Sequence, residues 1–288
     1  MRSFFRVYNK NYWVSVFGPI LTFLAPFIIT ILICEVYTFS VQGNPITLSI
    51  VVIPCLVFLS SYILMILIWP QAISEIKMSI LVKQLKSSSI KTWQILFAGI
   101  VYYAAAAIVA FAIAVCTARL LGVIQPTMSS QIVYMFDQIN WGEFIYVVVI
   151  NILVGCSIGM LIGSVFVSTA VISLVGVLIV FVSCALAGFL APLVLAPTQL
   201  KGLWYVSYVD VLRYPVTSMF EAWFSKAGPF NTNWSSLFDF STNYTCMLAD
   251  FVPYPFDVFK PADKILNLVM PYVTIGLSSI FAMRFFKM

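Results

Sequence analysis

The stretch EFIYVVVINILVGCSIGMLIGSVFVSTAVISLVGVLIVFVSCALAGFL, residues 143–190, decides the fold class of this chain. After Glu143 it contains no charged residue. About 20 consecutive apolar residues can cross a bilayer core as a helix, so this stretch is long enough for two crossings. We place one span over Glu143–Val167 and the next over Thr169–Leu190, joined by a very short turn at Ser168-Thr169. The segment predicts a helical hairpin in a membrane.

Four further apolar runs bring the prediction to six spans. They are Val14–Tyr37, Leu48–Trp69, Trp93–Cys116 and Ile265–Met283. If the amino terminus lies inside, the inner segments carry a single acid, Glu75, and nine basic residues: Arg2, Arg6, Lys10, Lys77, Lys83, Lys86, Lys91, Arg284 and Lys287. The outer segments then carry six basic and nine acidic residues. Basic residues gather on the cytoplasmic side of membrane helices, so we predict a multi-pass protein with both termini in the cytoplasm.

Composition agrees with this fold class, an all-α integral membrane protein. Hydrophobic residues make up 62% of the chain and charged residues 9%, whereas soluble domains have about 25% charged residues. No segment between the spans is long enough for a soluble domain of about 100 residues, so we expect one transmembrane domain over residues 1–288. Attraction of the inner segments to anionic lipid explains the net charge of +5, and no nucleic-acid partner is expected.

Several kinds of chemistry are not expected from this sequence. It contains no histidine and no Cys-x-x-Cys pair, so we predict no metal site. It contains no Gly-x-x-x-x-Gly-Lys-Ser/Thr loop, so this chain should not hydrolyse ATP by itself. Glu35, Arg119 and Glu143 lie near the outer ends of their spans, where interfacial charges are more common than charges on an ion pathway.

The first 13 residues have the pattern of a helix lying on a membrane surface. Arg2, Arg6 and Lys10 recur every four residues and share one stripe, flanked by aromatic rings. An interfacial helix would keep these charges outward and its rings in the headgroup boundary. The alternative is that the basic residues only determine topology.

Residues 71–92 form the main cytoplasmic segment, between spans two and three. Ile73 and Ile76 can share one face of a short amphipathic helix, and Lys83 and Lys86 another. A solvated positive loop is the alternative. Trp69 and Trp93 bracket the segment, as interfacial anchors would.

Two further features concern helix packing and the outer side. Gly155, Gly159 and Gly163 form a stripe of small residues in the fourth span, which favours close packing within the chain over a dimer face. Residues 191–264 lie outside but remain apolar and aromatic. Because backbone that dips into a membrane must be helical or covered by protein, we predict a re-entrant helix over Tyr208–Phe224.

The stretch ALAGFLAPLVLAPTQLKGLWYVSYVDVLRYPVTSMFEAW, residues 185–223, resembles the permease family of type 2 ATP-binding-cassette exporters. The family has a small-Gly pair here, which corresponds to Ala187-Gly188, followed by two prolines, which correspond to Pro192 and Pro197. Its hydrophobic–aromatic stretch corresponds to Leu203-Trp204. Its Asn-Pro-Leu-x-Tyr-like element corresponds to Leu212-Arg213-Tyr214, with Asp210-Val211 in place of Asn-Pro. The inner segment is also similar to the family's coupling region, at Glu75-Ile76-Lys77 and Leu85-Lys86-Ser87, although the usual proline is Ser89.

The resemblance implies an export function at a plasma membrane. Two membrane domains, copies of this chain or paralogues, would pair, and separate ATPase subunits holding ATP and Mg²⁺ would dock on the amino-terminal helix and the 71–92 segment. It implies ATPase coupling through Glu75, Ile76, Lys77, Lys83 and Lys86, and an outer gate or re-entrant element containing Gly188, Pro192, Trp204, Leu212, Tyr214 and Phe220. Spans two and five would line a path suited to an amphipathic or lipophilic cargo: a lipid, a peptide or a drug.

Two other classes of function remain open at this point. A secondary carrier would often show an internal repeat and broken helices, and the unequal loops here argue against that. A non-transporting membrane assembly or immunity protein would need no gate and no ATPase partner.

Overall fold

A computed structural model describes residues 2–39, 57–78, 92–124, 136–137, 139–187, 201–224 and 261–286 of the chain. Every regular element in these ranges is helical and none is a strand. Five helices are long and apolar enough to cross a membrane, and a bent pair at the amino end adds a sixth if it is one span. The prediction of a multi-pass helical membrane protein is confirmed at this level.

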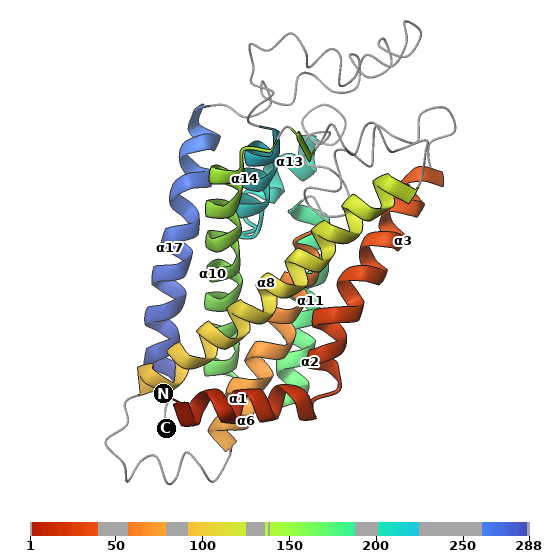
Figure 1. Ribbon diagram of the computed structural model, residues 1–288. Helices are drawn as coiled ribbons and strands as arrows, with labels where there is room; N and C mark the ends of the chain where they lie inside the picture. Colours follow the sequence, from red (N-terminus) through yellow and green to blue (C-terminus); the bar gives the residue numbers. More distant parts are fainter. Residues whose placement is uncertain are drawn as a thin grey trace, which may run out of the picture.

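The amino-terminal helix α1, Arg2–Val14, lies across one end of the bundle (Figure 1). A turn at Ser15-Val16 separates it from a continuous helix made of α2 (Phe17–Pro19), the π turn η1 (Ile20–Leu24) and α3 (Ala25–Phe39). The two directions differ by 87°. A Cβ at Gly18 would lie 3.0 Å from the Tyr12 carbonyl oxygen, so only glycine fits this bend without a shift. The helix that corresponds to the predicted first span therefore begins at Phe17, not at Val14.

The second span runs through the centre of the bundle as α5 (Leu59–Ile63), the π turn η2 (Leu64–Ile68) and α6 (Trp69–Met78). We predicted that it ends at Trp69-Pro70, and this is wrong because the helix continues to Met78. Pro70 lacks the N–H that would bond to the Ile66 carbonyl, and the chain widens into a π turn just before it. The Trp69 N–H donates to Leu64 O across that turn. The same device precedes Pro26, where the Ala25 N–H donates to Ile20 O.

The other spans surround this central helix. They are α8 (Thr92–Ile124), α10 (Trp141–Val165), α11 (Thr169–Leu186) and α17 (Pro261–Phe285). In Figure 1, α10 and α17 run side by side while α8 crosses the bundle obliquely. The most apolar stretch of the second span is 78% buried, whereas that of α11 is 17% buried.

The two ends of the bundle differ. α1, the end of α6 and the last turn of α17 lie at one end, which we call the termini end (Figure 1). The short helices α13 (Lys201–Ser207) and α14 (Arg213–Phe224) lie at the opposite end. The re-entrant helix predicted over Tyr208–Phe224 thus corresponds to a turn followed by α14, which packs against α10 and α17.

Candidate functional site

Helix α1 is attached to the termini end by aromatic side chains. The Tyr8 hydroxyl donates to the Ile95 carbonyl over 3.1 Å, and the Tyr8 ring lies 5.7 Å from that of Trp69. Tyr8 and Tyr12 are buried, whereas Arg6 and Lys10 are exposed. We expected the rings to sit in the lipid headgroup boundary, but these two tyrosines pack against α6 and α8. The side chain of Arg2 lies outside the described residues.

The residues predicted to couple to an ATPase have different surroundings. Glu75 is exposed and accepts a hydrogen bond from Asn11 Nδ2 of α1 over 3.4 Å. Ile76 is 4% exposed and belongs to the core. Lys77 donates to the Ser164 carbonyl over 2.7 Å at the end of α10, which satisfies a terminal carbonyl and complements the helix dipole. Lys83 and Lys86 lie outside the described residues.

Lys77 also joins the last turn of the chain to this corner. Its Nζ lies 5.7 Å from the centre of the Phe286 ring, just beyond the end of α17. Glu75 and Lys77 therefore do not lie on one common surface. Glu75 alone of the two faces outward beside α1, while Lys77 holds three helices together.

The glycine stripe of α10 lies against the central helix. A Cβ at Gly155 would lie 2.5 Å from Met65 Cε, one at Gly159 would lie 2.2 Å from the Met65 carbonyl oxygen, and one at Gly163 would lie 2.8 Å from the Pro70 carbonyl oxygen. At Gly159 and Gly163 the close atoms are backbone oxygens, so a side chain there would force the helices apart, whereas at Gly155 the close atom is the end of the flexible Met65 side chain. The glycine stripe of α10 therefore packs against the central helix of the same chain.

Trp69 occupies the middle of this packing and is fully buried. Its Nε1–H donates to the Cys156 carbonyl of α10 over 3.1 Å. A Cβ at Gly99 of α8 would lie 2.1 Å from the Trp69 ring, so α8 also approaches it closely. The prediction that Trp69 is an interfacial anchor is wrong, because the helix continues past Pro70 and carries the ring into the core. Trp93, by contrast, is 48% exposed.

At the opposite end, a turn closed by Asp210 leads into α14. Asp210 Oδ1 accepts a hydrogen bond from the Leu212 N–H over 3.0 Å and one from Ser183 Oγ of α11 over 3.3 Å. Burial raises the pKa of the Asp210 carboxyl above its ordinary value, and these two hydrogen bonds partly oppose the effect. Asp210 thus closes an Asx turn just before α14 and ties that turn to α11.

The residues predicted to form an outer gate are only partly described. Leu212 and Tyr214 are 2% and 4% exposed, and the Tyr214 hydroxyl donates to the Tyr208 carbonyl over 2.8 Å. They hold the first turn of α14 in place. The side chains of Trp204 and Phe220 are outside the described residues, and so are Gly188 and Pro192 altogether.

A buried polar chain connects the central helix to α14. The Tyr62 hydroxyl donates to Asn151 Oδ1, and Asn151 Nδ2 donates to the Pro215 carbonyl over 3.2 Å. Asn151 is fully buried in α10. We did not predict this group, although a lone asparagine inside the apolar run VVVINILV was the available signal, because such residues bond across helices in membranes.

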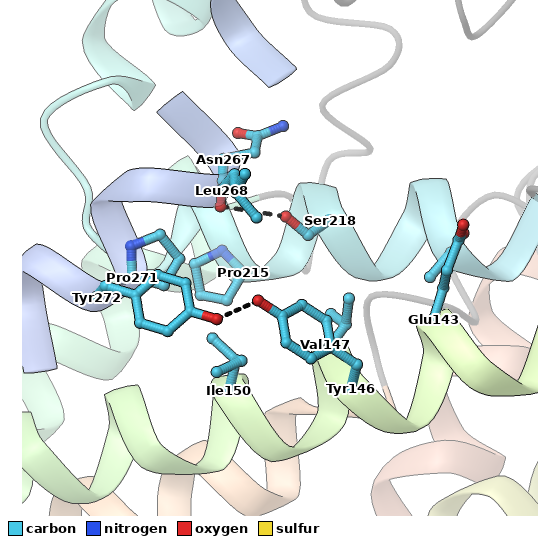
Figure 2. A pocket seen from close by; sticks show the side chains of 11 residues that line it. Glu143, Tyr146, Val147, Ile150, Pro215, Ser218, Asn267, Leu268, Pro271 and Tyr272 are labelled. Atoms are coloured by element: carbon cyan, nitrogen blue, oxygen red, sulfur yellow. Dashed lines mark hydrogen bonds between the residues drawn. The ribbon is translucent and has the colours of Figure 1, made fainter. Parts of the chain in front are cut away.

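A cavity of about 280 Å³ lies between α10, α14 and α17 at the same end (Figure 2). The polar residues that line it are Glu143, Tyr146, Tyr272, Ser218 and Asn267. The two phenols are hydrogen-bonded to each other. Ser218 Oγ donates to the Asn267 backbone carbonyl over 3.5 Å.

The outward surface of α11 is apolar. Leu174 is 62% exposed and Phe181 is 71% exposed. We expected the second and fifth spans to line a path together, but of the described parts only α11 presents an outer face, because the second span is central. Gln71 of α6 reaches α11, where its Nε2 donates to Ser173 Oγ over 3.0 Å.

Within the described ranges, no group of three or more acidic residues and cysteines could hold a metal ion. No protein-family model matches this chain, and no curated protein matches it either.

Proposed function

We propose that this chain is the permease subunit of an ATP-driven exporter of the type 2 ATP-binding-cassette class. In this role it crosses the plasma membrane six times with both termini in the cytoplasm. It pairs with a second membrane domain, either another copy of itself or a related chain. A separate ATPase subunit binds ATP and Mg²⁺ and docks at the termini end. The cargo is amphipathic or lipophilic.

The observation that carries this proposal is the unbroken helix from α5 to α6. Its exposed end carries Glu75 beside α1, and its middle is held by the buried Trp69. Its other end bonds through Tyr62 to Asn151, which in turn bonds to α14. A partner that displaces α6 at one end therefore acts on a rigid element that contacts the outer helix, as switching transitions in proteins require.

Helix α1 supports docking at the same end. It lies at 87° to the next helix, and its Arg6 and Lys10 side chains are exposed. This basic face suits anionic lipid headgroups or acidic groups of a partner. The hydrogen bond from Asn11 to Glu75 keeps α1 and α6 together, so that both would move with a docked subunit.

The apolar face of α11 supports pairing with a second membrane domain. Six large aliphatic and aromatic side chains on it are at least 40% exposed: Val171, Leu174, Val177, Leu178, Phe181 and Val182. A path walled by such residues suits an amphipathic or lipophilic cargo better than a small ion, because apolar walls cannot replace an ion's hydration shell.

The test is affinity purification of the chain in mild detergent, followed by identification of co-purified proteins and an ATPase assay. We expect a stoichiometric ATPase subunit. Glu75→Arg should release that subunit or uncouple its activity. Purification of the chain alone, without ATPase activity, would refute the exporter proposal. A secondary carrier and a membrane assembly protein would then be the candidate functions.

Asn11→Leu is the matched control for Glu75→Arg. Both substitutions remove the hydrogen bond between α1 and α6, but only Glu75→Arg changes a charge that would face a partner. Equal loss of the ATPase in both variants would show that Glu75 acts only by holding α1.

A further inference from the structure

The exposed face of α1 carries two cations and an indole in one row. Arg6, Lys10 and Trp13 stand at positions i, i+4 and i+7, which share one face of a helix. All three side chains are exposed, that of Trp13 by 58%. Tyr8 and Tyr12 lie on the opposite face and are buried. The row is therefore the face that α1 does not use for packing against the bundle.

The orientation of Trp13 is fixed by its neighbours. Its Nε1–H donates to Asn9 Oδ1 over 3.1 Å, and the same oxygen accepts a hydrogen bond from the Tyr102 hydroxyl of α8 over 3.0 Å. The indole also stacks on the Phe23 ring, with 6.3 Å between the ring centres and 24° between the planes. Trp13 is thus held in place although more than half of its surface is exposed.

The stack on Phe23 places the indole at a membrane boundary. Phe23 is 46% exposed and belongs to η1, near the start of the helix that corresponds to the predicted first span. α1 lies at 87° to this helix, across the termini end (Figure 1). A helix at right angles to a membrane-crossing one runs along the membrane surface, where tryptophan is common. The Trp13 ring therefore lies where the headgroups meet the hydrocarbon.

Charge and depth together restrict what can cover this row. Arg6 and Lys10 attract an anionic group, and the nearby acid Glu75 contacts α1 through the half-buried Asn11, not through the row. A soluble acidic protein could reach the two cations, but it could not reach the exposed Phe23 ring at the depth of the hydrocarbon. A molecule with a negative headgroup and an acyl chain reaches both.

We infer that the row on α1 binds an anionic phospholipid of the leaflet at the termini end. The headgroup lies between Arg6 and Lys10, and the first part of one acyl chain lies on the stacked rings of Trp13 and Phe23. The inference goes beyond the exporter proposal and does not depend on it, because it requires neither an ATPase nor a second membrane domain.

Native mass spectrometry of the detergent-purified chain tests this inference. Equal amounts of phosphatidylglycerol and phosphatidylcholine with identical acyl chains are added, and the ratio of the two bound lipids is measured. We expect a preference for phosphatidylglycerol of about 5-fold, because the two cations share one negative headgroup near a membrane surface. Equal binding of the two lipids by the unaltered chain would overturn the inference.

A charge variant and a matched control locate the headgroup. Replacing both cations, Arg6→Gln with Lys10→Gln, should lower the preference to about 2-fold or less. Arg284→Gln removes an exposed cation from the last turn of α17 at the same end and should leave the ratio unchanged. An unchanged ratio in the double variant, or an equal drop in Arg284→Gln, would overturn the inference. An acidic protein on this face would instead appear as a co-purified protein that only the double variant loses.

A tryptophan variant tests the position of the acyl chain. Trp13→Ala leaves both cations in place but removes half of the aromatic stack, so it should weaken the binding of phosphatidylglycerol several-fold in a lipid titration. Trp93→Ala is the matched control, because Trp93 is 48% exposed in the first turn of α8 and should not contact this lipid. Equal affinity of the two variants would refute the placement of the chain on the Trp13–Phe23 stack.

Discussion

Replacing Gly159 with alanine tests the close contact between α10 and the central helix. The added Cβ would lie 2.2 Å from the Met65 carbonyl oxygen and 2.9 Å from the Trp69 ring. A comfortable carbon–oxygen contact is about 3.3 Å, so the helices must separate locally by about 1 Å. The Met65 oxygen belongs to the backbone of the π turn Leu64–Ile68, and Met65 itself is fully buried. It cannot move alone, as the end of a flexible side chain could.

The expected change in the free energy of unfolding follows from two opposing effects. Overpacking of this kind costs about 1–3 kcal/mol, whereas exchanging glycine for alanine within a helix stabilises it by about 1 kcal/mol. Because backbone must shift, we expect the steric effect to lie in the upper part of its range. Gly159→Ala should then destabilise the fold by about 1–2 kcal/mol.

Gly276→Ala is the matched control, since a Cβ at Gly276 of α17 would meet no atom within 4 Å. It should be neutral or stabilising. The two variants should therefore differ by about 1–3 kcal/mol, or about 2–6 °C in thermal midpoint at about 2 °C per kcal/mol for a chain of this size. The assay is size-exclusion chromatography of the detergent-solubilised protein after heating. A Gly159→Ala variant as stable as Gly276→Ala would refute the proposed close packing.

Three further predictions concern single side chains. Trp69→Phe should lower the thermal midpoint by about 2–5 °C, because it removes the hydrogen bond to the Cys156 carbonyl and leaves a cavity in the core. Trp93→Phe, at a position that is 48% exposed, should have little effect. Asn151→Leu should lower the stability of the fold by about 1–3 kcal/mol, because it leaves the Pro215 carbonyl without this donor and removes the acceptor of Tyr62. The same heating assay measures this, and equal stability of the variant and the unaltered chain would contradict the buried polar chain. For Asp210, burial raises the pKa of the folded carboxyl, so the folded protein binds this proton more tightly than the unfolded chain, and stability should fall as pH rises between the ordinary and the raised pKa. Asp210→Asn keeps an oxygen that can accept the Leu212 N–H, and it should make the thermal midpoint less dependent on pH in this window. An unchanged slope would show that Asp210 is not responsible.

That the chain folds into several long apolar helices, and where some of them lie, could be predicted from the sequence because twenty apolar residues satisfy the bilayer constraint by themselves. The predicted Glu143–Val167 and Thr169–Leu190 correspond to α10 and α11 within a few residues. The close spacing of Gly155, Gly159 and Gly163 also indicated a packing face. These are local properties of the chain, and they require no knowledge of which helices become neighbours.

The second span was misjudged because proline has two outcomes inside a helix. We predicted that the span ends at Trp69, just before Pro70. Proline removes one donor and its ring clashes with the preceding turn, so a helix can end there. The π turn Leu64–Ile68 relieves that clash and the helix continues. Whether this happens depends on the glycines of other helices: Gly176 of α11 faces the Ile66 carbonyl, with a Cβ-to-oxygen distance of 2.9 Å. Such a partner is distant in sequence and invisible to local pattern.

The cavity could not be predicted for a similar reason. Glu143 was interpreted as an interfacial charge from its position at the end of a span, and Asn267 drew no attention. Their common cavity arises only because α17 packs beside α10 while α14 covers both. Sequence spacing relates residues on one helix, but it does not relate a position on α10 to one on α17.

The continuity of the second span through Pro70 determines what the proposed exporter can do mechanically. Had the helix ended at Trp69, Glu75 would belong to a separate element, and a docked ATPase would move only a surface segment. With the π turn, Glu75 and Tyr62 share one helix and lie about 20 Å apart along its axis, at 1.5 Å per residue. Trp69 lies between them, fully buried and bonded to α10, so the helix can tilt about this point more easily than it can slide. A tilt moves its two ends in opposite directions. A force that draws Glu75 towards a partner would then act on Asn151 and α14 at the far end, and Trp69→Phe should weaken that coupling even where it leaves the ATPase bound.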